Sequence, residues 1–175
     1  MVQSTRSYIG APGDFAFLEG TLRVRHRRLR QRLAGCVEWE VVEGGYRGFQ
    51  LADGAISVDE FRFPDGSTGC AFRALDLAAR RWSIWCLSSR DGKLGLPVHG
   101  GFDGSVGEFY GDDSHDGVPV KVRFVWHRPP EHAPRWEQAF SCDGDDWEVN
   151  WVMEFAPLDR ASMRDEPWST AAAPR

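Results

Sequence analysis

Two adjacent carboxylates, Asp59 and Glu60, lie in the middle of an apolar, strand-like stretch. Successive residues of a strand point to opposite faces, so we expect one of the two side chains to face the interior. A carboxylate in an apolar interior has a raised pKa unless it is paired, and such a group can do acid–base chemistry. The alternative is a buried ion pair with Arg62, Arg73 or the first strand, and either carboxylate could be the inward one.

His26 lies where the spacing of apolar residues changes phase. Leu22 and Val24 place the even-numbered side chains on the inner face, whereas Leu29 places the odd-numbered ones there. We therefore predict a β-bulge around residues 26–28, since bulges invert the alternation and are frequent beside active sites. If the bulge follows His26, its imidazole faces inward as an acid–base or ligand-orienting group. A hydrogen-bonded interior histidine is the alternative.

Arginines are concentrated in the same segment. They are Arg23, Arg25, Arg27, Arg28, Arg30 and Arg32. Such a run could bind phosphate or nucleic acid, but Glu38, Glu40 and Glu43 follow in the next segment. Cross-strand ion pairs on a solvated face therefore explain most of the run better. Arg28 is the arginine that we expect to reach the pocket, where it would clamp an anion.

Tryptophan is abundant, with eight residues in the chain, and most lie in strand-like segments on the expected inner face. Rings together with a few polar groups suit a flat aromatic or polycyclic ligand, held by stacking and one or two hydrogen bonds. The alternative is that the rings simply fill the interior. The candidate ligand-binding residues are Arg28, Trp39, Trp85, Tyr110, Trp126, Gln138 and Trp151; the candidate catalytic residues are His26, Asp59 and Glu60.

Repeated Asp-Gly pairs divide the chain into the short segments that must position these residues. The pairs begin at Asp53, Asp65, Asp91, Asp103, Asp116 and Asp143. Asp-Gly suits tight hairpins because both residues tolerate positive φ. Further turns are expected at Asp76–Ala79, at Pro129–His132 and at Ala34-Gly35, where a short turn would set Leu29 opposite Val41. This spacing is typical of an all-β sandwich or barrel.

Alternating apolar residues predict a strand in each of the segments between the turns. Val120, Val122, Phe124 and Trp126 share one face, for example. The short connections make consecutive strands antiparallel neighbours, and closure removes the exposed edges. We predict a closed antiparallel up-and-down β-barrel of about ten strands, with a sandwich as the alternative. The segments are 20–33, 36–51, 55–63, 67–75, 81–89, 94–102, 105–112, 118–127, 134–142 and 147–156.

The layout resembles the calycin-type barrels, which include lipocalins, fatty-acid-binding proteins and nitrobindin-like proteins, and most of all uncharacterised bacterial barrel domains. The resemblance covers most of residues 15–156 and is carried by Phe15–Gly20, Arg23–Arg28, Phe109–Asp113 and Trp136–Phe140. It implies a carrier of small molecules, although similar barrels also host isomerases, cyclases and decarboxylases. The fold alone does not decide between these functions.

Two departures from these families affect what the resemblance implies. Lipocalins usually open with Gly-x-Trp, whereas Gly20 is followed by Thr21 and Leu22. Nitrobindin-like proteins carry a haem-ligating histidine near the C-terminal end of the barrel, but no histidine follows His132 here. Haem binding is therefore the weaker alternative that the resemblance implies.

Composition narrows the function classes further. The net charge of −5 disfavours general nucleic-acid binding, and no stretch is apolar enough for a transmembrane helix. The four cysteines show no CxxC pair, and we interpret them as small hydrophobes of a cytoplasmic protein without metal. The chain contains no GxGxxG, P-loop or HExxH motif, so we expect no cofactor.

These observations define one barrel domain and a ranked set of functions. We expect a flexible N-terminus at 1–13, the barrel at 14–157 and a loosely ordered tail at 158–175. The first hypothesis is binding of a small apolar or aromatic molecule in the interior. The second is a cofactor-independent isomerase or cyclase that uses the same cavity. A homodimer through an outer face of the barrel is compatible with either.

Overall fold

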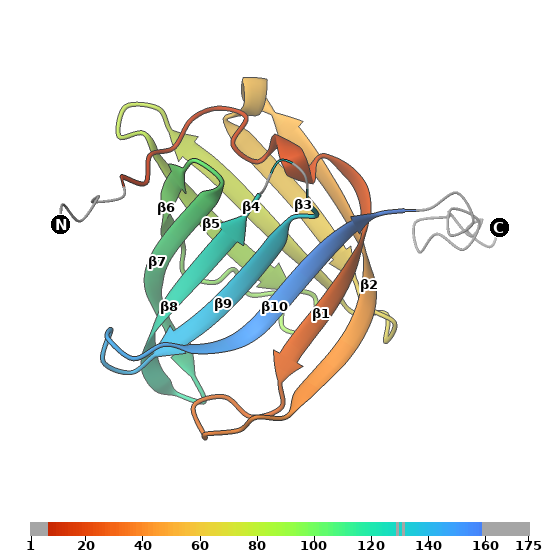
Figure 1. Cartoon of the computed structure of the whole chain (residues 1–175), viewed down its shortest axis with the longest axis vertical. Helices are drawn as coiled ribbons and strands as arrows, with labels where there is room; N and C mark the ends of the chain where they lie inside the picture. The colour runs from red at the N-terminus through yellow and green to blue at the C-terminus, as the bar shows by residue number, and fades with distance from the viewer. Residues whose placement is uncertain (1–6, 129, 131, 159–175) are drawn as a thin grey trace.

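Ten antiparallel strands, each paired with its neighbours in sequence, close into a barrel in the computed structural model (Figure 1). The structure describes residues 7–128, 130 and 132–158. β1 pairs with β10 and so closes the ring, which confirms the predicted fold class. The strands are β1 Gly20–Leu29, β2 Trp39–Leu51, β3 Ile56–Arg62, β4 Thr68–Asp76, β5 Arg81–Ser88, β6 Val98–Asp103, β7 Val106–His115, β8 Val118–His127, β9 Arg135–Ser141 and β10 Glu148–Pro157.

Alternation of apolar and polar residues forms the wall of the barrel. On β8, Val120, Val122 and Trp126 are buried toward the interior, whereas Lys121 between them is exposed. Asp-Gly turns reverse the chain as expected: Asp116 and Gly117 both have positive φ, 50° and 79°, between β7 and β8. This conformation matches the right-handed twist of the strands that it connects.

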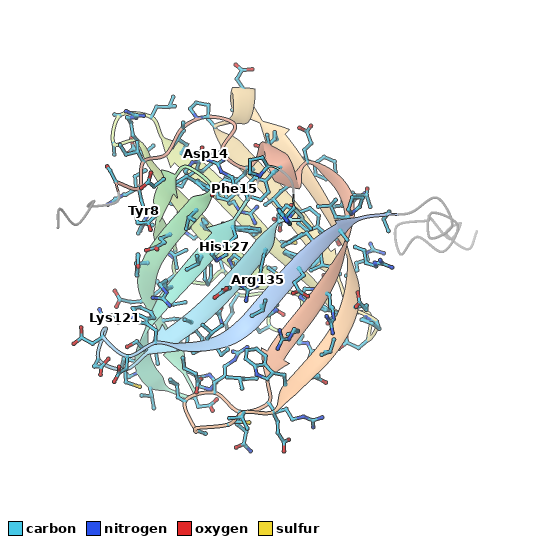
Figure 2. The ribbon with its side chains drawn as sticks, in the orientation of Figure 1. Tyr8, Asp14, Phe15, Lys121, His127 and Arg135 are labelled. Atoms are coloured by element: carbon cyan, nitrogen blue, oxygen red, sulfur yellow. The ribbon has the colours of Figure 1, made fainter. Side chains whose placement is uncertain are left out.

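One end of the barrel is closed by the short 3₁₀ helix η1, Ala16–Leu18, and the residue before it. Phe15 and Leu18 are fully buried, and the Phe15 ring packs edge-on against Trp82 and Phe102 at 4.9 and 5.2 Å. The carboxylate of Asp14 accepts a hydrogen bond from Trp82 Nε1 at 3.0 Å. Asp14 and Phe15 lie at this end in Figure 2.

The described part of the predicted flexible N-terminus lies against the same end of the barrel. Ile9 forms a β-bridge with Phe102, and the Gly10 amide donates to the Arg80 carbonyl at 2.7 Å. Residues 1–6 lie outside the described residues, as does the predicted tail from residue 159 onward. Among the described residues, no helix is long and apolar enough to cross a membrane.

The predicted bulge in the first strand is wrong. β1 pairs with β2 without interruption from Gly20 opposite Gly48 to Leu29 opposite Trp39. The connection between these strands spans residues 30–38, so no tight turn sets Leu29 opposite Val41. Val24 and His26 face the interior, whereas Leu29 lies on the outer face of β1 and is nevertheless buried. The sequence suggests a change of phase because a leucine is expected to mark the inner face. The register shift occurs instead in β10, between residues 149 and 151.

Candidate functional site

A cavity of about 590 Å³ occupies the barrel interior. This volume lies within the range of roughly 300–1,000 Å³ that is typical of small-molecule sites. Its wall is formed mainly by residues of β3–β6 and β8–β10. The aromatic lining residues are Phe61, Phe63, Phe124, Trp126, Trp136 and Trp151.

The cavity opens at the end of the barrel opposite to η1. Arg90, Asp91 and Lys93 line it, and all three are exposed residues of the connection between β5 and β6. At the other end, Phe15 and Leu18 are fully buried and form a floor that ligand cannot pass. The cavity is therefore a pocket with one mouth.

Aromatic rings shape the pocket into a set of flat surfaces. Trp136 packs edge-on against both Trp151 and Phe124, at 5.4 and 4.9 Å between ring centroids. Trp126 lies 6.4 Å from Trp136. Rings that hold one another at steep angles keep their orientation when a ligand enters, so the walls are preformed for stacking.

Arg28 lies at the mouth of the pocket, as the sequence predicts. It is on the inner face at the end of β1, and its Cζ lies 4.1 Å from the centroid of Trp151 and 4.6 Å from that of Phe63. Its Nε is buried without a hydrogen-bond partner. Burial, together with the charges of Arg32 and Arg90, lowers the pKa of Arg28 below its usual value.

His26 faces inward without a bulge, by simple alternation with Val24 and Arg28, and it is fully buried. Its Nδ1 accepts a hydrogen bond from Trp151 Nε1 at 3.3 Å, so the hydrogen of the neutral ring is on Nε2. Burial and the charge of Arg28 lower the pKa of His26 to about 3. The residues that line the cavity do not include His26, which lies behind the ring of Trp151 and next to that of Phe63.

Asp59 is the inward member of the acidic pair, and it is buried in an ion pair with Arg73. Its Oδ2 lies 2.5 Å from Arg73 Nη1 and accepts a hydrogen bond from the Tyr46 hydroxyl at 3.3 Å. Its Oδ1 accepts one from the Ala71 amide at 3.1 Å. Burial raises the pKa of Asp59, but these donors offset the cost of the charge, and the carboxylate in turn raises the pKa of Arg73. Arg73 lines the cavity, whereas Asp59 does not.

Glu60 points to the outer surface, where it pairs with Arg47 at 3.3 Å and Arg62 at 3.7 Å. A carboxylate between two surface guanidiniums cannot touch a molecule inside the barrel. The expectation that Glu60 is a catalytic candidate is therefore wrong, because alternation along β3 assigns the interior to Asp59.

Three of the predicted ligand-binding rings also lie on the outside. Trp39 stacks under Arg27 at 5.2 Å, and Tyr110 is 44% exposed and packs against Trp147. Trp85 packs against Phe72 on the outer surface at 5.8 Å. These predictions fail because aromatic residues occur on both faces of the sheet.

An apolar row on the outer face of β2–β5 explains the position of Trp85. The register sets Phe49 opposite Val58, Val58 opposite Phe72, and Phe72 opposite Trp85. Phe49 and Phe72 are 48% and 41% exposed. A sequence pattern that assigns large apolar residues to the interior cannot recognise such a row.

Three of the predicted ligand-binding residues, Trp126, Trp151 and Gln138, line the cavity, and their role in binding stays a prediction. Gln138 donates through Nε2 to Asn150 Oδ1 at 2.8 Å, and Asn150 is fully buried at the irregularity in β10. Asn150 was not predicted; an isolated amide next to aromatic residues carries no signal until the strand register is known.

The sequence does not identify Arg73 and Cys86 as residues of the site, although both line the cavity. The sequence pattern presents Arg73 only as a partner for the acidic pair, and Cys86 only as a small hydrophobic residue. The Cys86 thiol is accessible from the cavity but surrounded by protein, and burial raises its pKa to about 12. Inward placement of both follows from the pairing of β4 with β5.

No set of residues in the described part of the chain suggests a metal centre, since no three His, Cys, Asp or Glu side chains gather closely enough. The lining of the cavity contains no histidine, so the arrangement offers no imidazole ligand to a haem iron.

A scan against protein-family models and a search of curated proteins find no match to this chain. Function is therefore proposed from the geometry and chemistry of the cavity.

Proposed function

We propose that this barrel binds a small, flat, apolar or aromatic organic molecule in its interior. The observation that carries the proposal is the one-mouthed cavity of about 590 Å³ with preformed aromatic walls. A ring system inserted between Phe124, Trp136 and Trp151 would bury apolar surface and stack on fixed rings, both of which favour binding.

The placement of the polar groups favours a binding protein over an acid–base enzyme. An isomerase or cyclase needs an acid or base in contact with its substrate. His26 and Asp59, the inward candidates for that role, are both absent from the lining of the cavity. Within the protein, His26 Nδ1 accepts from Trp151 and Asp59 pairs with Arg73, whereas His26 Nε2 is buried without a partner.

We further propose that the barrel is of the calycin type. Its strands follow one another in up-and-down order, a short 3₁₀ helix precedes β1 at the closed end, and the interior holds the cavity. A cytoplasmic location stays a prediction from the sequence; the four cysteines are free, as a reducing compartment would leave them.

Binding can be measured with N-phenyl-1-naphthylamine, a neutral aromatic probe that fluoresces strongly once it leaves water. We expect saturable binding of one probe per protein. Cys86→Trp should lower the affinity about tenfold or more, because it places an indole inside a cavity of limited volume. Cys86→Ala is the matched control and should bind as the wild type does.

A circular-dichroism melt of both variants establishes that each is folded. Wild-type protein that shows no saturable binding, or a folded Cys86→Trp variant that binds with unchanged affinity, would overturn the proposed interior site.

A further inference from the structure

Cationic side chains gather at the mouth of the cavity, and they differ in whether a carboxylate pairs with them. The charged lining residues other than Arg73 are Arg28, Arg32, Arg90 and Lys93, with Asp91 and Asp113. Arg90 is paired with Asp65. By contrast, the side chains of Arg28 and Arg32 form no ion pair with any residue of the described chain.

Arg28 is held in place by rings instead of by a carboxylate. Its guanidinium stacks on Trp151 and Phe63, which fixes its position at the mouth. A guanidinium donates hydrogen bonds from its edge and not from its faces, so the two rings leave its N–H groups available to an acceptor. The buried Nε without a partner is one sign of this.

Burial and two neighbouring cations make the charged form of Arg28 less favourable than in water. Arg32 and Arg90 are close enough to oppose its charge, and burial removes water that would otherwise solvate it. Glu40, opposite on β2, and Asp65 act in the other direction, but neither forms an ion pair with Arg28. A bound oxyanion would relieve the repulsion and satisfy the N–H groups at the same time.

We infer that the ligand is an organic acid whose singly charged oxyanion, a carboxylate or sulfonate, binds the N–H edge of Arg28 while its apolar body fills the barrel. This inference rests on the proposed function, because it assigns the orientation and the chemical class of a molecule in the same cavity.

Two probes that differ by one group test the inference. 8-Anilinonaphthalene-1-sulfonate is N-phenyl-1-naphthylamine with a sulfonate added, so the pair isolates the contribution of the anion. In Arg28→Met we expect the dissociation constant of the sulfonate probe to rise about tenfold or more and that of the neutral probe to change less than about twofold. Arg28→Lys should give an intermediate loss, since it keeps a charge without the fork.

Arg23→Met is the matched control, with the same substitution on the outer face of the same strand. It should leave the binding of both probes unchanged. Added salt should weaken the sulfonate probe more than the neutral one.

The outcomes separate this inference from the proposed function. Equal losses for both probes in Arg28→Met, or no loss for either, would overturn the anion site while binding of the neutral probe to the wild type still supports the cavity. Absence of saturable neutral-probe binding would overturn the proposed function itself. If Arg28→Met does not fold, the sulfonate-specific loss in Arg28→Lys decides.

Discussion

His26 and Arg28 lie two residues apart on the same face of β1, yet they respond to burial in different ways. An imidazole sheds its proton, and burial together with the neighbouring Arg28 lowers the pKa of His26 to about 3. A guanidinium keeps its proton in proteins and needs a compensating partner. His26 is therefore a neutral buried group, whereas Arg28 is a charged group at the mouth of the cavity.

Acid should weaken the folded protein through His26. The pKa falls from 6.5 in the unfolded chain to about 3 in the folded one, so the folded state binds the proton less readily. Stability from this group is complete above about pH 6.5 and is lost as the pH falls toward 3. Between pH 7 and about pH 4.5 the loss is about 2–3 kcal/mol.

Urea unfolding at several pH values measures this loss. His26→Phe, which suits the aromatic surroundings but cannot titrate, should show a correspondingly flatter pH dependence. Identical pH profiles for the variant and the wild type would contradict the assignment.

The buried ion pair between Asp59 and Arg73 should behave differently from the surface pair of Glu60. Asp59→Asn or Arg73→Met alone leaves one uncompensated buried charge, with an expected cost of about 3–5 kcal/mol each. The double variant should cost less than the sum. Glu60→Gln, on the same strand but facing outward, should cost at most about 1 kcal/mol.

Denaturant titrations of the four variants test this difference. A Glu60→Gln variant as unstable as Asp59→Asn, or strictly additive effects in the double variant, would show that Asp59 and Arg73 do not act as a pair.

At the scale of elements, η1 and the residue before it are the floor of the barrel. Phe15 has no exposed surface and touches rings from β5, β6, β7 and β8. Asp14 is anchored by Trp82 and by Arg128, whose Nη2 lies 3.3 Å from its Oδ1. The two residues just before η1 thereby contact strands that lie far from them in the sequence.

Removing the Phe15 ring should destabilise the whole barrel. Phe15→Ala is expected to cost about 3–5 kcal/mol, because it leaves a cavity among rings that cannot collapse around it. Phe49→Ala removes the same ring from the outer row, where nearly half of it is exposed, and should cost much less. Thermal melts of the two variants compare them directly; similar losses would exclude the proposed role of Phe15.

The sequence predicts the strands well because the information is local. Alternation on β8 and the Asp-Gly turns identify where strands run and reverse. The sequence does not show whether Asp59 or Glu60 faces inward, because alternation gives only the orientation of one residue relative to the next. The pairing of Asp59 with Arg73 depends on the register of β3 with β4. Trp85 was misplaced for the same reason: periodicity cannot tell an inner row of rings from an outer one.

For the molecule as a whole, the cavity wall includes a slowly reacting thiol, Cys86, whose reaction rate should depend on what the cavity holds. With the pKa of Cys86 raised to about 12, little thiolate is present at pH 8. In a variant that retains only this cysteine, a small neutral thiol reagent should react about a hundredfold or more slowly than with an ordinary thiol of pKa about 8.5.

Occupancy of the cavity should slow this reaction further. Saturating N-phenyl-1-naphthylamine is expected to protect Cys86, and the reaction can be followed by mass spectrometry. A rate that does not change when the probe is bound would place the probe elsewhere on the protein.

The floor formed by η1 also has a kinetic consequence. Molecules that enter a dead-end barrel must leave by the way they came, so an incoming molecule meets the occupant at the mouth. Replacement of one occupant by another therefore waits for the first to depart, whatever the concentration of the second. Such a container exchanges its contents at the dissociation rate of the occupant, which makes residence time, more than competitor abundance, the property that governs how quickly its cargo turns over.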